Sequence, residues 1–211
     1  METVVYLVKH SEITPKSNVK YIKTDNTTQD IQEKAFLSVS GEKKAEELSK
    51  KAELQKIDAV YSSDYVSALQ TAKYFALENN TVIHIDNRLN ERKVGSVGQM
   101  EIKEFRRLQT KDFDFKLAGG ESLNQTKKRI VDAVKNILMF EAGNRVVIVS
   151  HRFALTCLLS AWCDKGHNYD DDIILTYNDE TIIDGNWPSS MVVKVTFDGM
   201  NVLSIEYLEN I

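Results

Sequence analysis

Two histidines each follow a short apolar run, with one polar residue between the run and the histidine. His10 follows residues 4–8 (VVYLV) and the pair Lys9-Ser11 flanks it, while His151 follows Ser150 at the end of residues 144–151 (NRVVIVSH). Continuous β-branched runs of this length are typical of strands covered on both faces in a parallel α/β sheet. Because the carboxyl ends of parallel strands open on one crevice, we expect both imidazoles there, where ligands bind. Solvated strand ends are the alternative interpretation.

A carboxyl group follows another apolar run. The segment RLNERKVGS (88–96) comes after residues 81–85 and brings Glu91 and Arg92 to the same region. A carboxyl group at that place could act as a general acid. An exposed charged loop is the alternative. The other two histidines, His84 and His167, are expected in packing or solvated positions.

The elements that must position these groups alternate along the chain. Apolar runs predict strands at 4–8, 57–63, 81–85 and 144–151, and helical spacing predicts helices after Ser40, after Asp64, and over 101–109, 122–140 and 153–162. The tail alternates apolar and polar residues around Asp198-Gly199, which indicates a hairpin. We therefore predict an α/β fold with three α/β/α layers. Its sheet is mostly parallel, with helices on both faces and a C-terminal antiparallel hairpin.

Composition narrows the class of protein. The 211 residues are 42% hydrophobic and 27% charged, which is typical of a globular chain, and no linker divides 1–211 into two domains. A net charge of −4 speaks against a general nucleic-acid or anionic-membrane surface. The sequence offers neither a membrane span nor a signal peptide, so we expect a cytoplasmic protein. Cys157 and Cys163 are expected as reduced core residues. A homo-oligomer is compatible with this sequence.

Selectivity for a substrate would come from three stretches of the chain. Residues 12–36 are polar and too long for a simple connection, so we expect them over the strand ends. Residues 86–120 and the acidic stretch YDDD (169–172) are the other two. None has a readable code for a substrate.

Several segments, in order, resemble the histidine phosphatase superfamily, the phosphoglycerate mutase-like proteins. They are VVYLVKHSE, LSVSGEKKAEEL, YSSDYVSALQTA, LNER, GGESL and VVIVSH. The resemblance implies one histidine phosphatase-like domain over 1–211 that needs neither metal nor cofactor. It implies that His10 is the nucleophile that becomes phosphorylated, Glu91 the proton donor to the leaving oxygen, and His151 a hydrogen-bonding electrophile on the phosphoryl group.

The chain also departs from the family pattern where phosphate would bind. Lys9 replaces an arginine, Ser11 a glycine, and Ser67 a second arginine. Lysine lacks the planar fork with which arginine holds phosphate, and loss of one preorganised donor costs about 3 kcal/mol of transition-state stabilisation. We expect these three positions to face the phosphate, with Arg92 and Arg152 as candidate replacements for the lost charge. An ordinary surface arginine is the alternative interpretation of each.

These features predict a phosphomonoesterase that acts through phosphohistidine on a small phosphorylated molecule or a phosphoprotein. The main alternative is a weak or inactive member that binds a phosphate ligand or a partner, which the altered clamp favours. A mutase is a lesser alternative. A metal hydrolase is disfavoured because no carboxylate or imidazole cluster at ligand spacing accompanies His10 or His151.

Overall fold

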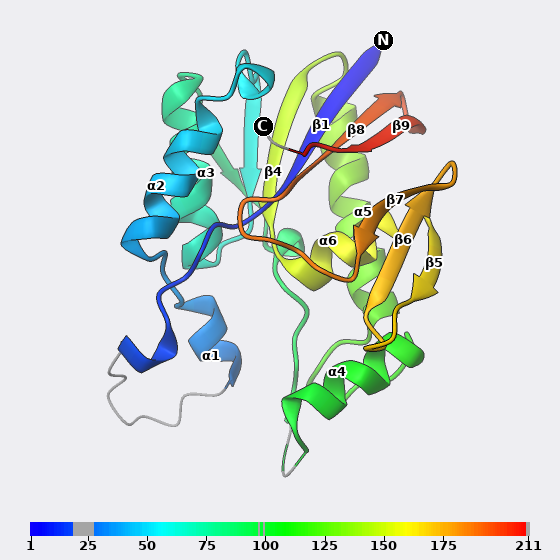
Figure 1. Cartoon of the computed structure of the whole chain (residues 1–211). Coiled ribbons are helices and arrows are strands. Elements are labelled where there is room, and N and C mark those ends of the chain that lie inside the picture. Colours follow the sequence, from blue (N-terminus) through cyan, green and yellow to red (C-terminus); the bar gives the residue numbers. More distant parts are fainter. Residues whose placement is uncertain (19–27, 97, 99, 210–211) are drawn as a thin grey trace.

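The main sheet of the computed structural model has six strands in the order β3-β2-β4-β1-β8-β9 (Figure 1). The structure describes residues 1–18, 28–96, 98 and 100–209. The strands of this sheet are β1 (Glu2–Lys9), β2 (Ala59–Ser62), β3 (Ile83–Ile85), β4 (Arg145–Ser150), β8 (Val192–Asp198) and β9 (Asn201–Tyr207). The first four run parallel to one another, and β8 and β9 extend the sheet antiparallel.

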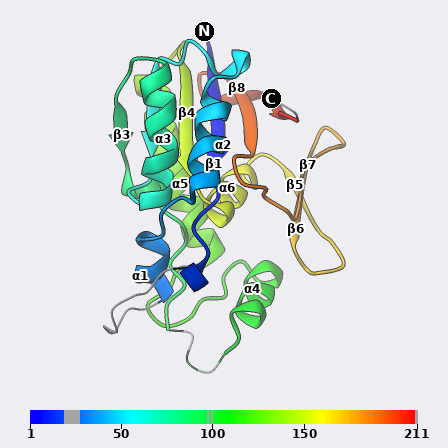
Figure 2. The ribbon, with the colours of Figure 1, turned by 60° about the vertical axis from the view of Figure 1, so that its left-hand side comes forward.

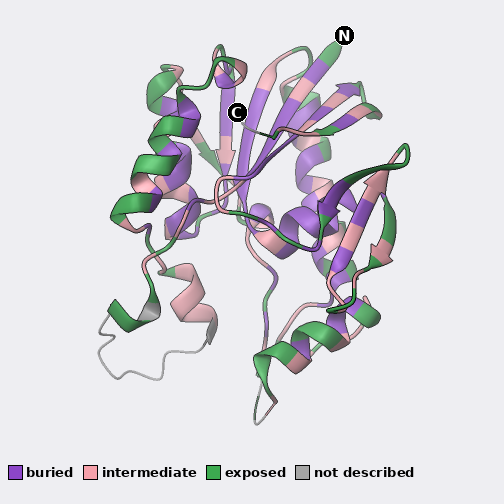
Figure 3. Ribbon diagram, viewed as in Figure 1, coloured by how far each residue is buried: buried purple, intermediate pink, exposed green. Residues whose placement is uncertain are grey.

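Helices cover both faces of this sheet (Figures 1 and 2). α2 (Val39–Ser49) and α3 (Val66–Glu78) cover one face, and α5 (Leu123–Phe140) and α6 (Arg152–Leu159) cover the other. α1 (Thr28–Glu33) and α4 (Ile102–Lys111) lie beyond the ends of the strands (Figure 1). Short 3₁₀ turns occur at Lys16–Asn18, Ala52–Leu54 and Asn87–Leu89. One core joins the sheet to α2 and α3, and a second joins it to α5 and α6. Figure 3 shows the buried residues along the strands and the inner helix faces. The prediction of three α/β/α layers is confirmed.

The register of β1 and β4 fixes where the two histidines emerge. Lys9 of β1 lies opposite Ser150 of β4, so both strands end at the same level of the sheet. The next residues, His10 and His151, therefore leave side by side. This is the shared crevice that the sequence predicts.

Two helix starts differ from the predicted ones. Ser38, rather than Ser40, caps α2, since its hydroxyl accepts a hydrogen bond from the Gly41 N–H at 2.9 Å. Asp64 does not cap α3: the N-cap residue is Tyr65, which makes no side-chain cap. Local sequence suggests several cap candidates, and the packing of the preceding loop decides among them.

A second sheet was not anticipated from the sequence. It is antiparallel, in the order β5 (Asp164–His167), β6 (Ile173–Tyr177), β7 (Glu180–Asp184). Its Ile173, Leu175 and Ile183 are buried in the core that contains α5 and α6. The acidic stretch 169–172 is thus the connection between two strands. Short strands with charged outer faces have weak sequence signals.

The C-terminal hairpin forms as predicted, with β8 paired to β9 and Gly199 in the turn at φ 59°. Of the polar stretch 12–36, residues 28–33 form α1, and 19–27 lie outside the described residues. In the described part of the chain, no helix combines the length and the apolar character that a membrane span requires.

Gly41 in the first turn of α2 permits a close approach that supports the segment after His10. A Cβ at this position would lie 2.0 Å from the carbonyl oxygen of Glu12, and the Gly41 carbonyl accepts the Ser11 hydroxyl at 2.7 Å. The absence of a side chain therefore allows α2 to pack against residues 11–12.

We predict that Gly41→Ala lowers the free energy of unfolding by about 2 kcal/mol or more, because backbone must move to admit the methyl group. Urea unfolding measures the change. Gly166→Ala is the matched control, since its nearest neighbour atom would be 3.9 Å away. Equal effects of the two substitutions would contradict the proposed close packing.

Candidate active site

His10 and His151 face each other at the ends of β1 and β4. Their ring centroids are 5.1 Å apart and their planes are inclined at 56°. Both rings line a cavity of about 150 Å³. Three segments besides the strand ends supply the rest of the lining: the loop after β1, the region of α1, and the start of α3. The loop after β3 adds the carboxyl group. The lining residues from these segments are Ile13, Gln32, Ala35, Tyr65, Ser67 and Glu91.

The hydrogen bond at Nδ1 of His10 defines which nitrogen is reactive. Nδ1 lies 2.8 Å from the Ser11 carbonyl oxygen, which can only accept, so the ring proton is on Nδ1. The lone pair is then on Nε2. Burial, with His151 and Lys9 nearby, lowers the pKa of His10 to about 3, so the ring is neutral at pH 7. A neutral imidazole with a free Nε2 is a nucleophile.

His151 is held by two neighbours. Its Nε2 lies 2.7 Å from the hydroxyl of Ser63, and its ring packs 4.7 Å from the ring of Tyr65. Burial, reinforced by the positive charges of Lys9 and Arg129, lowers the pKa of His151 to about 3. This imidazole is therefore also neutral at pH 7.

Glu91 reaches the cavity from the loop after β3, as the sequence predicts. Its Oε1 accepts hydrogen bonds from the N–H groups of Arg92 at 2.8 Å and Ala154 at 3.1 Å, and its Oε2 accepts from the N–H of Phe153 at 3.1 Å. Two of these donors belong to the first turn of α6, whose terminal N–H groups lack helical partners. The start of α6 therefore holds the carboxyl group of Glu91, which lines the same cavity as the two histidines.

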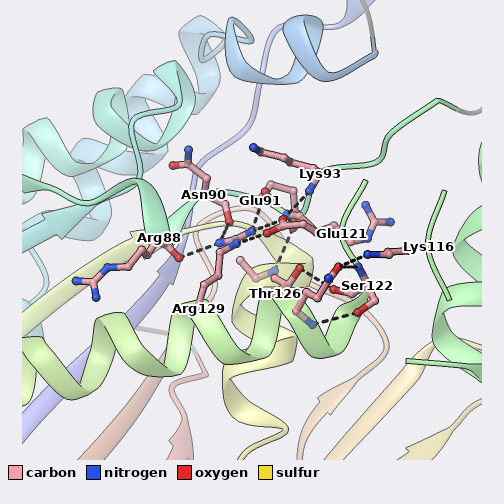
Figure 4. Close-up of polar contacts among 12 residues, drawn as sticks. Arg88, Asn90, Glu91, Lys93, Lys116, Glu121, Ser122, Thr126 and Arg129 are labelled. Atoms are coloured by element: carbon pink, nitrogen blue, oxygen red, sulfur yellow. Dashed lines mark hydrogen bonds and ion pairs between the residues drawn. The ribbon is translucent and has the colours of Figure 1, made fainter. Parts of the chain in front are cut away.

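Arg129 of α5 fixes the loop that carries Glu91 (Figure 4). Its Nη1 donates to the carbonyl oxygens of Arg88 and Asn90 at 2.8 and 2.9 Å, and its Nη2 donates to that of Glu91 at 3.1 Å. The guanidinium also pairs with Glu121 at 2.8 Å. Sequence reasoning did not identify Arg129, because contacts with backbone carbonyls leave no residue pattern to read.

The three altered clamp positions lie in different surroundings. Ser67 lines the cavity. Lys9 is half-buried at the end of β1, next to His10 but outside the residues that line the cavity. Burial and the charge of Arg152 lower its pKa, and its ammonium has no hydrogen-bond or ion-pair partner among the described residues. The Ser11 hydroxyl is used in packing, since it donates to Gly41 and accepts from Ser190 at 3.0 Å.

The two candidate replacement arginines lie outside the residues that line this cavity. Arg92 is 2% exposed, and its guanidinium lies 3.9 Å from the centre of the Phe153 ring. Its Nε and Nη2 have no hydrogen-bond partner in the described part of the chain. Arg152 donates through Nη2 to Asp172 and to the Gly185 carbonyl, each at 2.7 Å. Their role as phosphate ligands stays a prediction.

The residues that the sequence places outside the site lie in exposed or packed positions, with His84 and His167 exposed and the two cysteines buried. His84 stacks on Tyr61 with ring centroids 4.9 Å apart, and His167 Nε2 lies 2.8 Å from the Thr110 carbonyl oxygen. Cys157 and Cys163 are buried free thiols, and burial raises their pKa values to about 12 and about 11.

The neutral histidine pair makes stability dependent on pH. The pKa of each histidine is about 3 in the folded protein and about 6.5 in the unfolded chain. Between about pH 3 and about pH 6.5 the unfolded chain therefore binds more protons than the folded protein. We predict that unfolding free energy falls as pH decreases from about 6.5 to about 4.5, by up to about 1.4 kcal/mol per pH unit for each histidine.

Urea unfolding at a series of pH values measures this slope. His10→Gln and His151→Gln should each make it shallower, whatever their effect at pH 7. A slope that is unchanged in both variants would show that other groups cause the dependence.

Comparisons with known proteins agree with this architecture. The profile of the histidine phosphatase superfamily (branch 1) matches residues 5–185. A probable phosphoglycerate mutase, GpmB, of Salmonella choleraesuis is 29% identical over 175 residues, which cover 76% of this chain and 78% of that protein.

Solved structures share the fold. Bacillus stearothermophilus YhfR superposes with a TM-score of 0.67 at 24% identity, over 95% of this chain and 94% of the other. A mycobacterial glucosyl-3-phosphoglycerate phosphatase superposes with a TM-score of 0.65 at 16% identity, over 93% and 91% of the two chains. The family profile spans most of the sequence, including both strand-end histidines, and the chain belongs to the histidine phosphatase superfamily.

Proposed function

We propose that this protein is a phosphomonoesterase that forms a phosphohistidine on His10. The observation that carries the proposal is the contact of His10 Nδ1 with the Ser11 carbonyl oxygen, which leaves the lone pair on Nε2, in a cavity that His10 shares with Glu91 and His151. The substrate class that fits is a phosphate monoester, either a small molecule or a phosphoprotein. Membership of the superfamily supports this reaction class.

The geometry supports a two-step reaction. In the first step, Nε2 of His10 attacks phosphorus, the bond from phosphorus to the ester oxygen breaks, and protonated Glu91 delivers its proton to that oxygen. The Ser11 carbonyl, which accepts the Nδ1–H, stabilises the positive charge that develops on the ring. In the second step, the Glu91 carboxylate takes a proton from water, the water oxygen bonds to phosphorus, and the phosphorus–nitrogen bond breaks.

Charge at the phosphate site is the feature that limits the expected rate. Lys9, whose ammonium has no partner in the described part of the chain, is the cation that we assign to the phosphoryl oxygens, and Ser67 contributes no charge. A slow wild-type rate would therefore favour a weak phosphatase, or a family member that binds phosphate with little turnover.

A mutase is the second candidate, because the relative from Salmonella choleraesuis is named a probable phosphoglycerate mutase. A phosphatase releases the phosphoryl group to water, whereas a mutase returns it to an acceptor hydroxyl. Release of inorganic phosphate with each turnover would favour the phosphatase. Retention of the label in organic phosphate would favour the mutase.

We predict that a rapidly quenched reaction with a ³²P-labelled aryl phosphate leaves the label on His10. The bond should survive alkali and be lost in acid, as expected of phosphohistidine, and mass spectrometry should locate it. His10→Ala should abolish both label and turnover, whereas His84→Ala, an exposed histidine in β3, should keep both. Turnover without a label on His10 would remove the proposed nucleophile.

We predict that Glu91→Gln slows esters of poor leaving groups far more than activated aryl phosphates. Only the poor leaving groups need a proton, and general acid catalysis contributes about 10²- to 10⁴-fold. The measurement is kcat/KM over a series of esters with increasing leaving-group pKa, where the variant should show the steeper dependence. If kcat/KM depends equally steeply on leaving-group pKa in the wild type and the variant, Glu91 is not the general acid.

A further inference from the structure

Ser63 contacts the ring of His151 on the side that is bound by protein. It follows β2 and precedes α3, it is fully buried, and its Oγ lies 2.7 Å from His151 Nε2. Sequence reasoning assigned no role to this residue. A buried hydroxyl beside an imidazole nitrogen can determine which ring nitrogen carries the proton.

The hydrogen bonds around Ser63 favour one proton arrangement. Its Oγ also accepts from the Tyr65 N–H at 3.3 Å. If Nε2 of His151 carried the ring proton, the Ser63 hydroxyl proton would be left with no acceptor among the described residues, which is costly in a buried site. If the hydroxyl donates to Nε2, the hydroxyl proton and Nε2 are both paired, and the ring proton is left for a partner outside the described residues. A neutral ring then carries its proton on Nδ1.

The Nδ1 side of His151 is available to a ligand. Nε2 is occupied by Ser63, Nδ1 has no hydrogen-bond partner in the described part of the chain, and the ring lines the cavity that it shares with His10. A proton on Nδ1 therefore gives the cavity a hydrogen-bond donor, whereas a proton on Nε2 would present a lone pair that repels a phosphoryl oxygen.

We propose that Ser63 is a positioning residue that donates to His151 Nε2 and thereby holds the ring proton on Nδ1, as a donor to the ligand. The identification of that ligand as a phosphoryl oxygen rests on the proposed function. The two imidazoles then have the same tautomer but opposite tasks. His10 is fixed by a carbonyl acceptor and exposes a lone pair, and His151 is fixed by a hydroxyl donor and exposes an N–H.

The tautomer is measured directly by ¹⁵N NMR of the histidine side chains at pH 7. Comparison with His151→Gln assigns the signals of this ring. We expect wild-type His151 to show a protonated Nδ1 and an unprotonated Nε2. A protonated Nε2 in the wild type overturns the proposal, and this result does not depend on any variant folding or on turnover.

Substitutions test the dependence on the hydroxyl. Ser63→Ala should shift His151 toward the Nε2-protonated tautomer, and Ser63→Thr, which keeps the hydroxyl, should restore the wild-type signals. Ser160→Ala is the matched control, because it removes another buried hydroxyl, whose one hydrogen bond among the described residues is to the Cys157 carbonyl. An unchanged tautomer in folded Ser63→Ala overturns the role of Ser63.

Kinetics and ligand binding separate this inference from the proposed function. With an aryl phosphate, Ser63→Ala should lower kcat by about a hundredfold, with a much smaller change in KM, and should have little effect in a His151→Gln background. If Ser63→Ala lowers kcat just as much in the His151→Gln background as in the wild type, the positioning role is overturned. In the wild type, inorganic phosphate should shift the Nδ1 signal. If the His151 tautomer depends on Ser63 but phosphate does not shift the Nδ1 signal, the role of Ser63 is supported and phosphate is not the ligand.

Discussion

Parallel pairing of β1 with β4 is the constraint on which the site depends. The two strands are separated by more than a hundred residues, yet their register puts Lys9 opposite Ser150, so that His10 and His151 emerge together. A slip of one residue would turn each side chain to the other face of the sheet. The buried apolar side chains of these strands, packed between two helical layers, prevent such a slip.

Burial gives this pair its chemical character. An imidazole in water is partly protonated near neutral pH, but the His151 ring is buried, the His10 ring is partly buried, and both lie near the ammonium of Lys9, so both remain neutral. Neutrality leaves one proton on each ring, and its position then depends on the hydrogen-bond partner. The Ser11 carbonyl and the Ser63 hydroxyl are these partners.

The Glu91 carboxyl group is bound by backbone N–H groups, and an arginine side chain holds the loop that carries it. The N-terminus of α6 binds the Glu91 carboxyl group, and Arg129 of α5 holds the carbonyls of the loop that carries it. Both helices pack on the same face of the sheet. Helix packing on that face thus sets the distance between the carboxyl group and the histidines, and the loop itself needs little regular structure.

The sequence alone determined the fold class and the strand-end positions of His10 and His151, and its resemblance to the family implied a role for Glu91. Apolar runs, helical spacing and the Asp198-Gly199 turn are local signals, and residues at strand ends inherit their positions from the sheet. Cap choice at Ser38, the second sheet, and the contacts of Ser63 and Arg129 were decided only by tertiary structure. The same holds for Arg152, whose partner Asp172 lies in another element. The physical reason is that these features depend on contacts between distant segments, and a hydrogen bond to a carbonyl or a hydroxyl imposes no spacing on the sequence.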